Sequence, residues 1–74
     1  MPLAKNLLRS AREQRSLTQG QLAEQARVSR QTIISIEGGR YVPSLELALT
    51  FARIFHCRVE DLFDIEEESH ARQA

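Results

Sequence analysis

Cysteine, proline, glycine and aromatic residues are all scarce in this sequence. Its 74 residues include one cysteine, two prolines and three glycines, and tryptophan is absent. The single thiol, Cys57, cannot form a disulfide within the chain, which argues against a disulfide-stabilised fold and is typical of a reducing compartment. The amino-terminal residues lack the apolar run of a signal peptide, and no stretch approaches the roughly 18 apolar residues of a membrane span. We therefore expect one soluble domain in the cytoplasm.

Motifs that indicate catalysis or a metal site are also missing. His56, Cys57 and His70 show neither C-x-x-C nor H-x-x-x-H spacing, so they do not predict a metal site. The run Glu66–Glu68 is typical of a solvated tail, and no Gly-rich phosphate loop is present. We expect no active site, no metal and no cofactor, and a small enzyme is a distant alternative.

Charge is balanced overall but not along the chain. Ten basic and ten acidic residues give a formal net charge of zero. Residues 1–58 nevertheless carry nine basic against four acidic residues, whereas residues 59–74 carry six acidic residues against Arg72 alone. A basic body can meet an anionic partner even when an acidic tail cancels its charge. We expect a domain over residues 1–63 and an acidic, frayed tail over residues 64–74.

Apolar residues recur at spacings of three and four, and no strand-like alternation of useful length interrupts them. Thr18 with Gln21 fits a capping box, Ser29 is a second capping residue, and Gly38 begins a glycine pair that stops a helix. The predicted fold class is all-α. Its expected helices span residues 3–14, 19–25, 29–37, 45–56 and 59–63.

The second and third expected helices are joined only by Ala26, Arg27 and Val28, which suits a sharp crossing and predicts a helix-turn-helix. Ala23 supplies the small residue that such a crossing needs. A resemblance to the Cro and repressor family of DNA-binding domains, also called lambda-repressor-like or XRE, spans residues 3–63. It is carried by LTQGQLAEQARVSRQTIISIEGG and PSLELALTFARIF. The resemblance implies a compact five-helix domain whose helix 29–37 enters the major groove of double-stranded DNA.

Helix 29–37 has two different faces when its residues are placed about 100° apart. One side, expected to face mainly the core, holds Ser29, Thr32, Ile33 and Ile36. The opposite side holds Arg30, Gln31, Ile34 and Ser35. A guanidinium can bond guanine, a carboxamide can bond adenine, and an apolar group can touch the thymine methyl. We expect these four residues to contact bases, with an ordinary solvated face as the alternative.

The resemblance also implies roles outside this helix. Gln19 matches a family glutamine that contacts the DNA backbone, and Arg40 and Tyr41 follow the helix where the family places phosphate contacts. Arg12 and Glu37 match a family ion pair that ties the first helix to the third. Each of these residues could instead be a solvated surface residue.

Two positions depart from the family pattern. Arg27 stands in the turn where the family commonly has glycine, and a left-handed backbone there would cost a non-glycine residue about 1 kcal/mol. Arg58 stands where a small capping residue often precedes the fifth helix. Neither position lies on the predicted groove face.

The fourth expected helix carries more apolar surface than one core face needs. Besides an inward repeat of Leu45, Ala48, Ala52 and Phe55, the helix has a second apolar series at spacings of four and three, which consists of Leu47, Phe51 and Ile54. We expect a homodimer whose interface includes Leu47, Ile54 and Ile65, with Phe51 shared between core and interface. A monomer with a wide core stripe is the alternative.

The predicted function is transcription regulation, most simply repression, through binding of helix 29–37 to a palindromic operator. The main alternative is a protein-binding module, such as the antitoxin of a toxin–antitoxin pair, because one fold can serve several functions. Large apolar or acidic residues at positions 30, 31 and 35 would favour a protein partner. The residues that stand there favour DNA.

Overall fold

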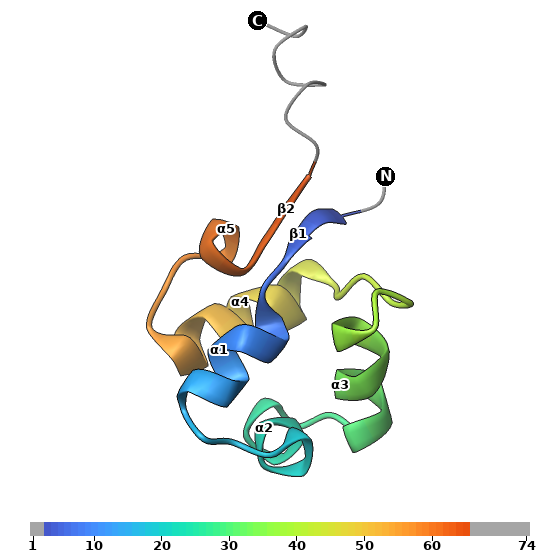
Figure 1. Cartoon of the computed structure of the whole chain (residues 1–74), viewed down its shortest axis with the longest axis vertical. Coiled ribbons are helices and arrows are strands. Elements are labelled where there is room, and N and C mark those ends of the chain that lie inside the picture. Colours follow the sequence, from blue (N-terminus) through green and yellow to red (C-terminus); the bar gives the residue numbers. More distant parts are fainter. Residues whose placement is uncertain (1–2, 66–74) are drawn as a thin grey trace, which may run out of the picture.

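Five short helices and a two-stranded sheet form the computed structural model of this protein, which describes residues 3–65. Figure 1 shows the sheet at one end of the molecule, α2 at the other, and α3 along one side. In chain order the elements are β1 (Leu3–Asn6), α1 (Leu8–Gln14), α2 (Gln19–Ala26), α3 (Arg30–Glu37), α4 (Leu45–Phe55), α5 (Val59–Leu62) and β2 (Phe63–Ile65).

The core lies where α1, α2, α3 and α4 meet. Its fully buried large side chains are Leu8, Leu22, Ile33, Ile36 and Phe51. Each such side chain contributes about 1.5–3 kcal/mol through the apolar surface it removes from water. The ring of Phe63 from β2 completes this core, with its centroid 6.4 Å from that of Phe51 and the two rings tilted by 46°. The core therefore holds α3 from its buried side.

The prediction of an all-α fold is wrong at the two ends of the domain. Residues Leu3–Asn6, expected as the start of helix 3–14, form β1 and pair antiparallel with β2. Leu3 pairs with Ile65, and Lys5 pairs with Asp64. Strands of four and three residues are too short for a sequence to reveal their alternation. The prediction of five helices is confirmed.

Asn6 marks the change from strand to helix. Its Oδ1 accepts a hydrogen bond from the Leu8 N–H at 3.3 Å, and its Nδ2 donates to the Ile36 carbonyl at 2.8 Å. The Leu7 N–H donates to the Leu62 carbonyl at 2.8 Å. A helix that started at Leu3 would forgo these bonds between distant parts of the chain. The first helix therefore begins at Leu8.

β2 extends past residue 63, where the domain was expected to end. Asp64 and Ile65, which the sequence assigns to the tail, lie in β2 and pair with β1. The rest of the expected tail, residues 66–74, lies outside the described residues. The sheet therefore joins both ends of the described chain.

Arg27 ends α2 in the left-handed conformation, with φ 61° and ψ 42°. The Arg27 N–H donates to the Glu24 carbonyl at 3.2 Å, and the Val28 N–H donates to the Ala23 carbonyl at 3.0 Å. These bonds satisfy the last carbonyls of α2 and turn the chain toward α3. The turn thus places a side chain where the backbone geometry favours glycine.

Arg27→Gly is expected to raise the free energy of unfolding by about 0.5–1 kcal/mol. Glycine removes the Cβ penalty at positive φ, and its greater freedom in the unfolded chain offsets part of that gain. Thermal unfolding measures the change, and the melting temperature should rise by about 2–8 °C. Glu24→Gly, at an exposed position within α2, is the matched control and should lower stability by about 1 kcal/mol. An Arg27→Gly protein that melts below the parent would contradict the prediction.

Candidate nucleic-acid interface

Local hydrogen bonds fix the start of both helices of the helix-turn-helix. Thr18 and Gln21 form the expected capping box: the Gln21 N–H donates to Thr18 Oγ1 at 3.0 Å, and the Thr18 N–H donates to Gln21 Oε1 at 2.8 Å. Ser29 Oγ accepts from the Thr32 N–H at 3.1 Å. Ser29 and Thr32 thus serve the cap; Ser29 is exposed and Thr32 is half-buried, so neither faces mainly the core. The caps set where the two helices cross.

α3 presents the expected polar face to solvent. Ile33 and Ile36 are fully buried and anchor the other side of the helix. Gln31 Nε2 lies 3.5 Å from Ser35 Oγ, a long and therefore weak contact. The four predicted base-contacting residues are all accessible; Arg30 and Gln31 are exposed, and Ile34 and Ser35 are half-buried.

Two hollows flank this face of α3. The first, of about 690 Å³, lies between α1, α2 and α3, and its lining includes Arg9, Gln19, Arg30 and Ile34. The second, of about 300 Å³, is lined by Ser29, Gln31, Thr32, Ser35, Arg40 and Tyr41. The exposed side of α3 is therefore a ridge with arginine on both flanks. A ridge of this kind suits a groove that is bordered by two phosphate backbones.

The structure brings Arg12 and Glu37 together at the wall of the first hollow. Arg12 Nε donates to Glu37 Oε2 at 2.7 Å and Arg12 Nη2 donates to Glu37 Oε1 at 3.2 Å, so the pair is bidentate. The side chains are 11% and 5% exposed. The hydrogen bond to Glu37 raises the pKa of Arg12. Arg12 Nη1 also donates to the Leu17 carbonyl at 2.8 Å, and this links α1 to the loop before α2.

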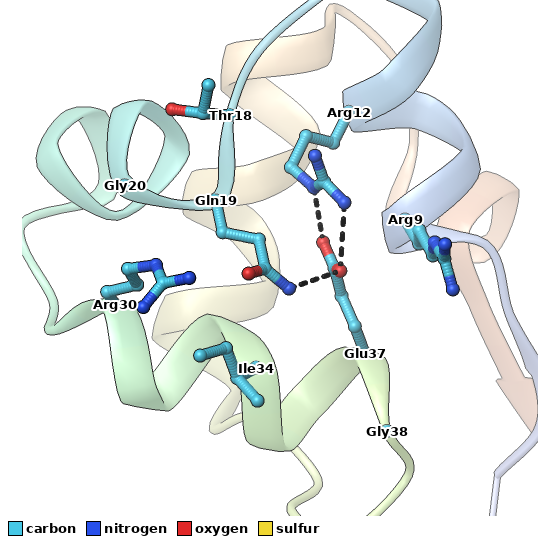
Figure 2. A pocket seen from close by; sticks show the side chains of 9 residues that line it. All are labelled: Arg9, Arg12, Thr18, Gln19, Gly20, Arg30, Ile34, Glu37 and Gly38. Atoms are coloured by element: carbon cyan, nitrogen blue, oxygen red, sulfur yellow. Dashed lines mark hydrogen bonds and ion pairs between the residues drawn. The ribbon is translucent and has the colours of Figure 1, made fainter.

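Gln19 joins the same network. Its Nε2 donates to Glu37 Oε1 at 3.2 Å, so the carboxylate holds side chains from both α1 and α2. Figure 2 shows Gln19 and the Arg12–Glu37 pair in the middle of the hollow, with Arg30 at one end and Arg9 at the other. The predicted backbone contact is therefore oriented by the predicted ion pair.

Arg40 and Tyr41 lie on the opposite flank of α3. Both residues are exposed, and the Arg40 N–H donates to the Ser35 carbonyl at 2.9 Å. Gly39, with φ 78°, supplies the left-handed turn that directs the chain back along α3. The loop therefore places a guanidinium and a phenol next to Gln31 and Ser35.

The residues expected at a dimer interface lie in different environments. Phe51 is fully buried within one chain, so its side chain belongs to the core and has no surface left for a partner. Leu47 and Ile54 are half-buried and pack against the core, and Ile65 is 37% exposed. The large apolar side chains of α4 that are exposed are Leu45 at 70% and Leu49 at 52%.

Sequence reasoning missed Arg9, and it wrongly placed Leu45 in the inward repeat, whereas Leu45 and Leu49 form an exposed stripe. Arg9 lies three residues before Arg12, so a helix that begins at Leu8 places both on one side. Leu45 and Leu49 are four residues apart and share a face of α4. The spacing of three could have placed Arg9 beside Arg12, but the expected helix 45–56 starts at the same residue as α4, so a helical wheel gives no signal for the exposed stripe.

Of the three residues weighed as metal ligands, His56 and Cys57 lie within the described residues 3–65, and His70 lies outside them. His56 is exposed at the end of α4 and Cys57 is half-buried beside it. Burial raises the pKa of the Cys57 thiol. Across the described part of the chain, no three His, Cys, Asp or Glu side chains are grouped so that they could hold a metal ion. None of the helices there is long and apolar enough to cross a membrane.

Known proteins are similar to this chain in sequence and in fold. A helix-turn-helix family model matches residues 8–62. An uncharacterized HTH-type transcriptional regulator of Methanocaldococcus jannaschii is 48% identical over 64 residues, which cover 86% of this chain and 97% of the relative. The HTH-type regulator YgzD of Bacillus subtilis is 43% identical over 65 residues, covering 88% and 98%. The crystal structure of the clp gene regulator ClgR from Corynebacterium glutamicum matches with a TM-score of 0.68 at 35% identity, covering 73% of this chain and 69% of that one.

Proposed function

This chain belongs to the Cro/repressor-type helix-turn-helix family and is a DNA-binding transcription regulator, and from that premise we propose that it is a repressor that reads a palindromic operator as a homodimer. It would act in the cytoplasm by binding rather than by catalysis. The observation that carries this proposal is the exposed face of α3, whose arginine and carboxamide have no ion pair or strong hydrogen bond elsewhere among residues 3–65. Such groups are available to a partner.

The proposed contacts with DNA form two layers, one to the base edges and one to the phosphate backbone. Arg30 would bond guanine, Gln31 adenine, Ile34 the thymine methyl, and Ser35 a neighbouring base edge. Gln19, Arg40 and Tyr41 would contact the phosphate backbone on the two flanks and so fix the position of the protein on the duplex.

Selection of bound duplexes from a random pool tests the proposal. The purified protein should enrich an inverted repeat whose half-sites lie about one helical turn apart, or a multiple of that distance. A protein that carries Arg30→Ala and Gln31→Ala together is the matched control, because both positions are exposed and the fold should persist. Enrichment of no sequence by the parent protein would contradict a DNA-reading function.

Repression is the simplest consequence of such binding. A protein bound at a site that overlaps the polymerase-binding site excludes polymerase without any further contact. Transcription in vitro from a promoter that carries the selected site should fall as the protein is added. An increase in transcript would identify an activator instead.

We propose that dimers form through the exposed apolar surface next to the sheet. A hollow of about 250 Å³ at this place has an apolar lining apart from Asp64, and the lining includes Leu3, Val42, Leu45 and Ile65. Val42 is 53% exposed and Leu45 is 70% exposed. Leu47 and Ile54 would contribute only the parts that the core leaves uncovered. Because a single half-site gives little specificity, a second copy is the occupant that this function requires.

Leu45→Lys is expected to weaken the dimer about 100-fold or more. In a two-fold interface the change acts twice, and each buried leucine is worth about 1.5–3 kcal/mol. Sedimentation measures the loss, and affinity for the full palindrome should approach that for one half-site. Leu7→Lys is the matched control, because Leu7 is also exposed, at 44%, but lines a different hollow. A Leu45→Lys protein that remains dimeric would place the interface elsewhere.

A protein partner, such as the toxin of a toxin–antitoxin pair, is the second candidate. The same apolar surface favours it, since Val42, Leu45 and Ile65 could meet another protein. A toxin gene next to the gene for this chain, followed by co-purification of the two proteins, would support this candidate. Binding to such a partner is compatible with operator binding through α3.

A further inference from the structure

Arg9 lies on the far side of the first hollow from α3, and the predicted roles leave it without a function. Its side chain is 71% exposed, and its Nε donates to Glu13 Oε2 at 3.1 Å within α1. Figure 2 shows Arg9 at the end of the hollow opposite Arg30, with Gln19 between them. Three elements therefore contribute to one concave surface.

The hollow is cationic. Its lining includes Arg9, Arg12 and Arg30 against one carboxylate, that of Glu37. The bidentate bond to Arg12 already occupies that carboxylate. Two guanidinium groups, from α1 and α3, thus remain to attract an anion.

The contact between Arg9 and Glu13 does not prevent Arg9 from binding an anion. An exposed ion pair between residues four apart on one helix is weak, and water screens it. A phosphate accepts charge-assisted hydrogen bonds from arginine, and these bonds are stronger. Arg9 can therefore exchange Glu13 for a phosphate, or contact the phosphate through the terminal nitrogens that Glu13 leaves free.

We propose that this hollow binds a backbone phosphate of one operator strand, with Arg9 as the contact on the α1 side. The inference rests on the proposed function, because the strand comes within reach only when α3 lies in the major groove. Arg30 and Ile34 border the hollow on the base-reading side, and Gln19 lies between them and Arg9. One strand backbone then crosses from α3 over the start of α2 to α1. The other backbone lies along Arg40 and Tyr41 in the second hollow.

Arg9→Gln tests the proposal in binding to the selected operator at several salt concentrations. Loss of one phosphate contact should lower the magnitude of the slope of log affinity against log salt by about 0.9, which corresponds to about eightfold weaker binding at 0.1 M salt. The ratio of affinities for the operator and its single-base variants should not change. Glu13→Gln should have the opposite effect on affinity, because it releases Arg9 and removes an anion from the edge of the hollow. Arg53→Gln, on an exposed part of α4 that lines another hollow, is the matched control and should change neither quantity.

The outcomes separate this inference from the proposed function. If the parent protein selects an operator but Arg9→Gln binds as tightly and with the same salt slope as Arg53→Gln, the phosphate site is refuted and the function stands. If the parent protein selects no operator, the function itself fails. A further experiment compares the thermal unfolding of the parent protein and of Arg9→Gln when inorganic phosphate replaces chloride at equal ionic strength. Stabilisation of the parent but not of Arg9→Gln, together with a salt slope of DNA binding that Arg9→Gln leaves unchanged, would assign the hollow to free phosphate and overturn its assignment to the DNA backbone.

Discussion

Replacing Glu37 by leucine is expected to lower the free energy of unfolding by about 3 kcal/mol. The guanidinium of Arg12, which is almost buried, then loses the carboxylate that balances its charge. That side chain is 11% exposed and loses the bonds of 2.7 and 3.2 Å to Glu37. A domain of 74 residues has a total stability of about 4–11 kcal/mol, so the loss is a large share of it. Denaturant unfolding followed by circular dichroism measures the change.

The losses of stability caused by Glu37→Leu and Arg12→Met should not be additive. Arg12→Met leaves the Glu37 carboxylate, which is 5% exposed, without its cation and should cost a similar amount. The double variant removes both charges and should lose less than the sum of the two, which a double-mutant cycle records as a coupling energy. The exposed pair Arg9–Glu13, with side chains 71% and 54% exposed, is the matched control, and its coupling should be about 0.5 kcal/mol or less. Additive losses at Arg12 and Glu37 would contradict the role of this pair.

The start of the domain shows what local sequence could not predict. The spacing of Ala4, Leu7, Leu8 and Ala11 fits the inward face of one helix, yet residues 3–6 form a strand and Leu7 is 44% exposed. The decisive bonds run from Asn6 to Ile36 and from Leu7 to Leu62, across 30 and more positions of the chain. By contrast, the starts of α2 and α3 depend on bonds between residues three apart, such as Thr18 with Gln21. Sequence reasoning found these starts because both partners lie within one helical turn.

The candidate site shows the same contrast between local features, which the sequence predicts, and long-range contacts, which it does not. The exposed face of α3 could be predicted, since a helical wheel and the two buried isoleucines determine it. The bond from Gln19 to Glu37 joins positions 18 apart, and periodicity does not reveal such a contact. The helical wheel of α4 correctly indicated more apolar surface than the core needs, but it assigned the surplus to the wrong residues. It cannot distinguish Phe51, which the chain buries itself, from Leu45, which the chain leaves exposed.

Arg30→Ala and Arg40→Ala are expected to weaken operator binding in different ways, because they lie in different layers of the proposed contact. Arg30 lies in the first turn of α3, from which a side chain can reach a base edge. Its loss, like that of Gln31, should cost about 1–3 kcal/mol on the preferred operator and relax base preference at one position of each half-site. Arg40 lies in the exposed loop beyond the glycine pair. Its loss should weaken binding to all sequences alike and lower the magnitude of the salt slope by about 0.9 for each phosphate contact.

Ile34→Ala separates the two layers within α3 itself. A contact with the thymine methyl displaces no counterion, so the variant should lose preference for thymine while its salt slope stays that of the parent. Binding to the selected operator, to its single-base variants and to unrelated DNA, each at several salt concentrations, resolves all of these effects. Circular dichroism should show that every variant is folded, since the changed side chains lie on the surface or at its edge. If Arg30→Ala and Gln31→Ala leave both affinity and base preference unchanged, α3 does not read the operator, and the exposed surface around Leu45 becomes the main candidate for the functional contact, with a protein as its partner.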